Sequence, residues 1–118
     1  MSESIAATYA YRTLVAETAA SGGMLPRVAY LAVGSGITPY TLDDTGLENE
    51  FHRVPAAGVA TGIVLAATGT VPGAEIVGST IREIGVFAED GTLMARRVVA
   101  AKELEPESSL DVELIFQY

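Results

Sequence analysis

The chain contains no cysteine, no tryptophan and a single histidine among its 118 residues. Thiol chemistry and disulfides are therefore excluded, and a structural zinc site has almost no ligands to draw on. A chain of this length nevertheless buries roughly two-thirds of its extended-chain surface, which is enough to fold without such cross-links. We therefore expect one domain over residues 1–118, with no metal and no cofactor.

Basic residues are also scarce, with 7 Lys and Arg against 15 Asp and Glu, so that the net charge is -8. Affinity for phosphate backbones comes mainly from basic side chains, and this balance argues against nucleic-acid binding. No run approaches the roughly 20 apolar residues of a membrane span, and the N-terminus lacks the basic and apolar regions of a signal peptide. We expect no nucleic-acid or membrane partner, and synthesis in the cytoplasm without secretion.

The N-terminal part of the chain has the period of an amphipathic helix over about residues 4–20. Apolar and small side chains recur there at helical spacing, at Tyr11, Leu14, Val15 and Thr18. Gly22 and Gly23 are suited to a left-handed C-cap and predict the end of this helix. The sequence Thr45-Gly46-Leu47-Glu48 has the spacing of a capping box and predicts a single helical turn.

The rest of the chain reads as strands and turns. Extended segments are predicted over 28–33, within the glycine-interrupted apolar run 59–67, over 76–87 with a bulge near 78–79, over 93–100 and over about 110–116. The segments 80–87 and 93–100 form a hairpin across a tight turn. A helix followed by strands predicts an α+β fold, mainly antiparallel β and sandwich-like, with about five or six strands and the β part over about 28–118.

Two local patterns suggest chemistry but fit a structural role better. Gly34-Ser35-Gly36 begins like a dinucleotide-binding fingerprint, but Pro39 replaces the third glycine and no amphipathic helix follows. His52 has no nucleophile elbow of the Gly-x-Ser-x-Gly type to serve, so a catalytic histidine is not favoured.

An acidic cluster over residues 43–50 offers oxygen ligands for calcium. The candidate ligands are Asp43, Asp44, Glu48 and Glu50, but their spacing is not that of an EF-hand loop. A solvated turn followed by a charged segment explains them equally well, so no metal site is assigned.

Arg82 and Glu83 place two opposite charges inside an apolar β segment. A strand bound for the core carries charges only when they are paired, exposed or used. Cross-strand partners are available, namely Arg96 or Arg97 for Glu83, and Glu50, Asp111 or Glu113 for Arg82. Two interpretations stay open: an ion pair within the fold, or a pair between neighbouring copies of the chain.

Three ordered motifs carry a resemblance to a known family. They are YLAVGSG over Tyr30–Gly36, DDTGLENEFHR over Asp43–Arg53, and TIREIGVF over Thr80–Phe87 followed by Asp90-Gly91 and Leu93-Met94-Ala95-Arg96. The set, spanning roughly Val28 to Lys102, resembles the tail-collar fibre proteins of tailed bacteriophages, in which "vGsGtT", "dTxLxnExxR" and "tIrEiGlFdxdGxLxAr" occur in this order.

The resemblance implies a structural protein of a phage or prophage virion, in a tail-collar, tail-fibre or baseplate-attachment module, with no catalysis. It implies other phage tail proteins as partners, a homo-oligomer with a trimer favoured, and a place in the virion tail. Members of the family often continue into a long shaft and a receptor-binding tip, whereas this sequence ends at Tyr118. We therefore expect attachment rather than adhesion.

Within this family framework the charged residues of the motifs are candidates for structural or interface roles: Glu48, Glu50, Arg53, Arg82, Glu83 and Arg96. We hypothesise that Arg53 and Arg82 tie the turn containing Glu48 and Glu50 to the hairpin through bidentate carboxylate contacts.

Two other classes of function are considered. A carbohydrate-binding β-sandwich would need exposed aromatic side chains, for which Tyr40 and Tyr118 are candidates and Tyr30 is expected in the core. A small enzyme would need His52, Arg82 and Glu83 to line one pocket within hydrogen-bonding reach of a shared substrate. Neither is preferred to an assembly protein.

Overall fold

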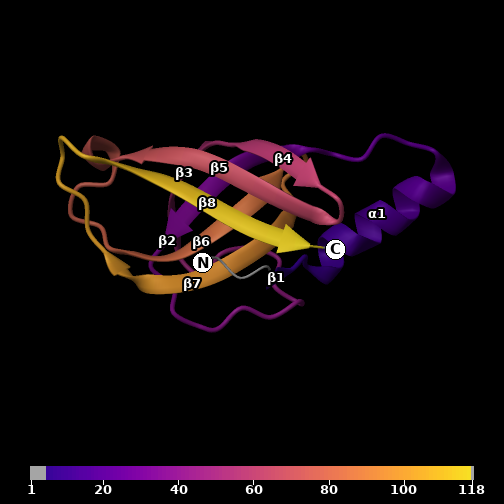
Figure 1. Ribbon diagram of the computed structural model, residues 1–118. Coiled ribbons are helices and arrows are strands. Elements are labelled where there is room, and N and C mark those ends of the chain that lie inside the picture. The colour runs from indigo at the N-terminus through magenta and orange to yellow at the C-terminus, as the bar shows by residue number, and fades with distance from the viewer. Residues whose placement is uncertain (1–4, 118) are drawn as a thin grey trace.

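A computed structural model describes residues 5–117, and these form two four-stranded sheets and one helix. The first, here called the β8 sheet, has the order β1 (Ile5–Ala6), β8 (Ser109–Gln117), β5 (Val64–Pro72) and β4 (Ala57–Thr61). The second, the β6 sheet, has the order β3 (Glu50–Pro55), β2 (Val28–Gly34), β6 (Ile81–Ala88) and β7 (Leu93–Lys102). All pairings are antiparallel except that of β1 with β8 (Figure 1).

The predicted α+β class with a single helix is confirmed, but residues 5–117 form eight strands rather than five or six. The additional strands include β3, in which the polar residues His52 and Arg53 are adjacent, and β4, whose residues are all exposed. Neither segment has the alternation of apolar and polar side chains that marks a half-buried strand.

Helix α1 (Tyr9–Ser21) begins later than the sequence predicts. The Thr8 side chain accepts a hydrogen bond from the Tyr11 backbone N–H and caps the helix, while Ile5 and Ala6 pair with β8 instead. Gly22 ends the helix as predicted, with a left-handed φ of 76°. Ser4, where the prediction placed the start, lies outside the described residues.

Two further segments differ from the predictions. Residues 76–80 form a turn rather than the start of a strand, since the backbone of Ser79 bonds back to Ile76 and Gly78 adopts a φ of 81°. Residues 45–48 form no helical turn, because Glu48 is held by contacts with other parts of the chain that are described below. A short 3-10 helix, η1 (Gly73–Glu75), follows β5.

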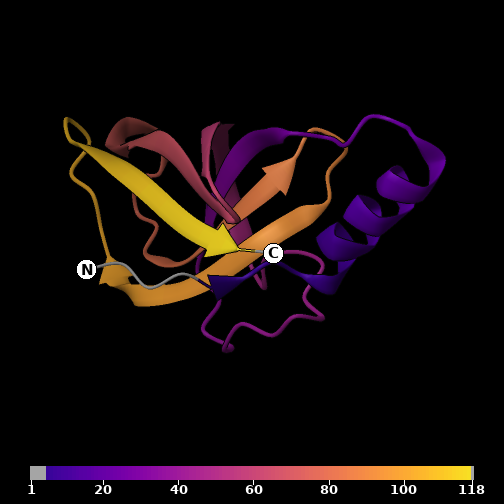
Figure 2. The ribbon, with the colours of Figure 1, turned by 45° about the vertical axis from the view of Figure 1, so that its right-hand side comes forward.

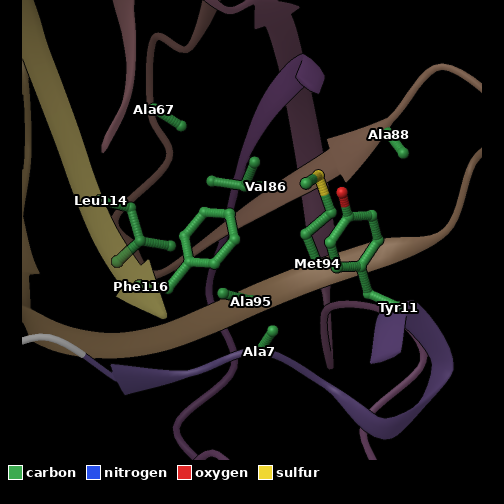
Figure 3. Close-up of a cluster of buried hydrophobic side chains, with 9 residues drawn as sticks. All are labelled: Ala7, Tyr11, Ala67, Val86, Ala88, Met94, Ala95, Leu114 and Phe116. Atoms are coloured by element: carbon green, nitrogen blue, oxygen red, sulfur yellow. The ribbon is translucent and has the colours of Figure 1, made fainter. Parts of the chain in front are cut away.

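The core lies between the sheets and extends under the start of α1. Figure 3 shows Phe116 and Leu114 of β8 facing Val86 and Ala95 of the β6 sheet, with Tyr11 of α1 packed beside Met94. A second cluster fills the other end of the sandwich, around Leu31, Val33, Val71, Ile76, Ile81 and Val112. No helix among residues 5–117 is long and apolar enough to cross a membrane.

The loop between β2 and β3, residues 35–49, covers the face of the β6 sheet that points away from the β8 sheet (Figure 2). Leu47 of this loop packs against Ala32, Phe87 and Leu93 on that face. The β6 sheet is therefore covered on both sides, which explains why β6 is buried at nearly every position.

Candidate functional site

The carboxylate of Glu83 lies beneath the 35–49 loop and is fully buried. Its Oε2 accepts hydrogen bonds from the backbone N–H groups of Gly36 at 2.7 Å and Asn49 at 2.8 Å. Its Oε1 accepts from the backbone N–H of Glu48 at 2.9 Å and from Arg96 Nε at 2.8 Å. One side chain thus satisfies donors from both ends of the loop and from the neighbouring strand.

Arg96 extends this arrangement to a third part of the loop. Its side chain is 2% exposed, and its Nη1 donates to Asp44 Oδ2 at 3.2 Å. Asp44 in turn accepts from the backbone and hydroxyl of Thr41. The Arg96 Nη2 is buried and has no hydrogen-bond partner among residues 5–117.

Burial alone raises the pKa of Glu83, because it disfavours the charged carboxylate. The hydrogen bonds from Arg96 and from the three backbone N–H groups favour the charged form and outweigh burial, so that the pKa is lowered overall. Glu83 is therefore ionised at neutral pH and forms a charge-assisted network with Arg96.

Glycines allow the loop to approach the carboxylate this closely. A Cβ on Gly34 would lie 2.6 Å from Glu83 Oε2, and a Cβ on Gly36 would lie 2.5 Å from the same atom. On β6, a Cβ on Gly85 would lie 2.5 Å from the Leu47 side chain. The glycine-rich sequence after β2 is therefore explained by close packing on Glu83, and the Gly36 N–H that resembles a phosphate-binding donor is used by that carboxylate.

The side chain of Glu48 closes the loop on itself. Its Oε1 accepts from the backbone N–H of Ile37 at 2.8 Å and of Thr38 at 3.2 Å, and its Oε2 accepts from the Thr38 hydroxyl. These bonds, led by the one from the hydroxyl, lower the pKa of Glu48. The predicted capping role of Glu48 is thus exercised across the loop rather than within a helical turn.

Arg53 and Glu50 form a second, separate contact on β3. Arg53 donates from Nε and Nη2 to the two oxygens of Glu50, each at 2.9 Å. The guanidinium also lies 4.1 Å from the centre of the Phe87 ring and 5.6 Å from that of Tyr30. This is the bidentate contact we expected of Arg53, and it reaches the hairpin through cation–π contact with Phe87.

The structure brings together three of the six candidate residues, Glu48, Glu83 and Arg96. It pairs Glu83 with Arg96, one of the two partners that the sequence offered. Arg82 is exposed and makes no ion pair within residues 5–117, so Arg96 occupies the bracing position that we expected for Arg82.

Sequence reasoning named Asp44 only in the acidic cluster and missed its pairing with Arg96, and it missed the backbone donors of Gly36 and Asn49. These residues do lie within the three motifs, and that was the one sequence signal for them. A backbone N–H donor cannot be recognised from residue type, because every residue except proline has one.

The residues of the enzyme hypothesis lie in different environments. His52 Nε2 is 3.1 Å from Glu75 Oε1, whereas both Glu83 oxygens are engaged with the loop and Arg96. No hydrogen bond or ion pair within the described residues joins any two of His52, Arg82 and Glu83. The acidic cluster is also divided, and residues 5–117 contain no group of three metal-ligating side chains arranged to hold an ion.

The two tyrosine candidates within residues 5–117, Tyr30 and Tyr40, make separate contacts. Tyr30 is 40% exposed, not in the core as expected, and its ring faces Arg53. The Tyr40 hydroxyl donates to the carbonyl of Ala6 at 2.7 Å, and burial raises the pKa of Tyr40 to about 12. Tyr118 lies outside the described residues.

Comparisons with protein-family models, with curated proteins and with solved structures found no match. The ionised carboxylate of Glu83 joins both ends of the 35–49 loop to the β6–β7 hairpin. Chemically, this arrangement fixes the shape of the loop surface above the β6 sheet.

Proposed function

We propose that this chain is a structural protein of a phage or prophage virion. It acts in a tail-collar, tail-fibre or baseplate-attachment module by protein–protein assembly, without catalysis. Its partners are other tail, fibre or baseplate proteins and further copies of the chain, with a trimer favoured, and its place is the virion tail.

The observation that supports the proposal most strongly is the convergence of the three motifs at Glu83. The first motif supplies Gly36, the second supplies Glu48 and Asn49, and the third supplies Glu83 and Arg96. Because the three motifs meet in one packed network, their residues can be explained by the need to keep the shape of the loop, without any catalytic role. That is the kind of pattern expected of a family whose members dock through a fixed surface.

The bonding of the acidic and basic candidates supports the absence of catalysis. A general acid or base needs a free proton position within reach of a substrate. Both oxygens of Glu83 instead accept hydrogen bonds from backbone N–H groups. Glu48 accepts from the Thr38 hydroxyl and from two backbone N–H groups, and Arg96 is buried against Glu83.

Mass spectrometry of purified particles tests this proposal. Particles are induced from the strain that carries the gene and banded on a density gradient, and the chain should band with the capsid protein at a fixed stoichiometry. The same preparation from a strain with the gene deleted should contain particles with defective or missing tail appendages. Absence of the chain from intact, infectious particles would contradict the proposal.

A further inference from the structure

A cleft lies where the 35–49 loop meets Arg96. Its volume is about 140 Å³, and it is lined by Thr38, Asp44, Gly46, Glu48 and Arg96. Every side chain in this lining is polar or charged. The cleft therefore suits a small polar group rather than an apolar one.

Arg96 is the most deeply buried residue of the cleft, and one of its nitrogens is not used by the fold. Its Nε donates to Glu83 and its Nη1 to Asp44, whereas Nη2 is buried and has no hydrogen-bond partner among residues 5–117. A guanidinium carries two N–H donors on that nitrogen. Because a buried donor without a partner has lost its hydration and gained nothing in return, an acceptor that reaches Nη2 is bound more strongly than at an exposed arginine.

The two carboxylates of the cleft each keep a free acceptor position. Asp44 Oδ2 accepts from Arg96 Nη1 and from the Thr41 backbone, but Oδ1 accepts only from the Thr41 hydroxyl within residues 5–117. Glu48 Oε1 accepts from two backbone N–H groups, whereas Oε2 accepts only from the Thr38 hydroxyl in the described part of the chain. Since a carboxylate oxygen has two lone pairs, Oδ1 and Oε2 can each accept one more hydrogen bond.

We propose that this cleft binds a primary carboxamide, presented by an asparagine or glutamine side chain of a protein that docks on the 35–49 loop. A carboxamide has an acceptor oxygen for Arg96 Nη2 and an N–H₂ group for Asp44 Oδ1 or Glu48 Oε2. The inference rests on the proposed function, which supplies the docking proteins, and it names the side-chain chemistry of their contact.

The charges of the cleft disfavour ionised side chains of similar size. A carboxylate could accept from Arg96 Nη2, but it would lie beside Asp44 and Glu48 and be repelled by both. An ammonium group would suit the two carboxylates, but it has no acceptor for Nη2 and would place a second cation beside Arg96. Of the three groups, the neutral carboxamide alone satisfies both the donor and the acceptors.

An NMR titration of the full, isotope-labelled chain with three capped tripeptides tests the proposal. The peptides are acetyl-glycyl-X-glycine N-methylamides in which X is glutamine, glutamate or lysine, so that they differ only in the group offered to the cleft. The glutamine peptide should shift the backbone amide signals of Thr38 and Gly46, with a dissociation constant of about 10 mM or lower. The glutamate and lysine peptides should bind at least about tenfold more weakly, because each leaves a charge or a donor unmatched.

A matched pair of glycine variants locates the binding. Gly46 lines the cleft, and a Cβ there meets nothing within 4 Å, so Gly46→Leu adds an apolar side chain at the cleft without a clash in the fold. This variant should bind the glutamine peptide at least about tenfold more weakly than wild type. Gly23→Leu adds the same side chain in the segment after α1, where a Cβ meets only the Ser21 hydroxyl oxygen at 3.5 Å, and should bind like wild type. Unchanged amide signals from the β2 and β6 strands show that both variants are folded.

Three results would overturn the inference. They are the absence of shifts with the glutamine peptide up to about 100 mM, equal binding of the three peptides, and binding that Gly46→Leu leaves unchanged. Each of them can occur with the chain still present in virions, so the proposed function is judged separately by the particle experiment.

Discussion

Arg96 lies directly opposite Gly85 across the β6–β7 pairing, and its Nε reaches back to Glu83 Oε1 at 2.8 Å. Both side chains are buried, with 0% of Glu83 and 2% of Arg96 exposed. Because Gly85 has no side chain, Leu47 of the loop packs over that position beside the ion pair. The pair and the glycine between them therefore form the floor on which the 35–49 loop rests.

Replacing the carboxylate should release the loop at a large cost in stability. Glu83→Gln leaves the buried Arg96 with Asp44 as its one remaining carboxylate partner, and it presents an amide N–H₂ where backbone donors point. We expect the free energy of unfolding to fall by about 3 to 5 kcal/mol in urea titrations. Glu17→Gln on the exposed face of α1 serves as the matched control and should change it by less than about 0.5 kcal/mol. A loss no larger than that of the control would show that the network does not stabilise the fold.

The two partners should also be energetically coupled. Glu83→Leu leaves the buried Arg96 with Asp44 alone, and Arg96→Leu leaves the buried Glu83 carboxylate without a cationic partner, whereas the double variant removes both buried charges. The double variant should therefore be less destabilised than the sum of the single variants, by about 1 to 3 kcal/mol. A double-mutant cycle from equilibrium unfolding measures this difference, and strict additivity would argue against a direct interaction.

The close approach of the loop predicts different effects at two glycines. A Cβ at Gly36 meets Glu83 Oε2 and the Cβ of Glu48, whereas a Cβ at Gly46 meets nothing within 4 Å. Gly36→Ala should lower the free energy of unfolding by about 1 to 3 kcal/mol through overpacking. Gly46→Ala, in the same loop, should be neutral within about 0.5 kcal/mol. Equal effects at both positions would mean that the loop does not pack on Glu83.

The lowered pKa of Glu83 predicts a pH dependence of stability. A carboxyl whose pKa is lower in the folded state binds fewer protons there than in the unfolded chain. Its contribution is complete above the unfolded pKa of about 4.3 and is lost as the pH falls through the lower folded value. The stability difference between wild type and Glu83→Gln should therefore be constant from pH 7 to about 5 and shrink below about 4.3. A constant difference down to pH 2 would contradict the assignment.

Much of the fold follows from patterns that residue type records. Tyr11, Leu14 and Val15 mark the buried face of α1, and the alternation from Leu110 to Phe116 marks β8, because burial selects side chains directly. Strand β4 carries no such record, since all of its residues are exposed and its pairing with β5 uses only the backbone.

The candidate site divides in the same way. The pairing of Glu83 with a β7 arginine could be predicted because a buried charge needs a partner. The contacts of Glu83 with the loop could not, because three of its four donors are backbone N–H groups positioned by a chain path that the sequence does not specify locally. Arg82 misled the prediction since alternation alone placed it among apolar neighbours, and the register shift between Ile81 and Glu83 leaves it exposed.

Amide hydrogen exchange at neutral pH tests the organising role of Glu83 most directly. In wild type, the amides of Gly36, Glu48 and Asn49 should be protected like those of the β2 and β6 strands, because each donates to the buried carboxylate. In Glu83→Gln these three amides should lose protection, while the amides of the β2 and β6 strands should keep theirs. Unprotected loop amides in wild type, or the same protection in both proteins, would contradict the account.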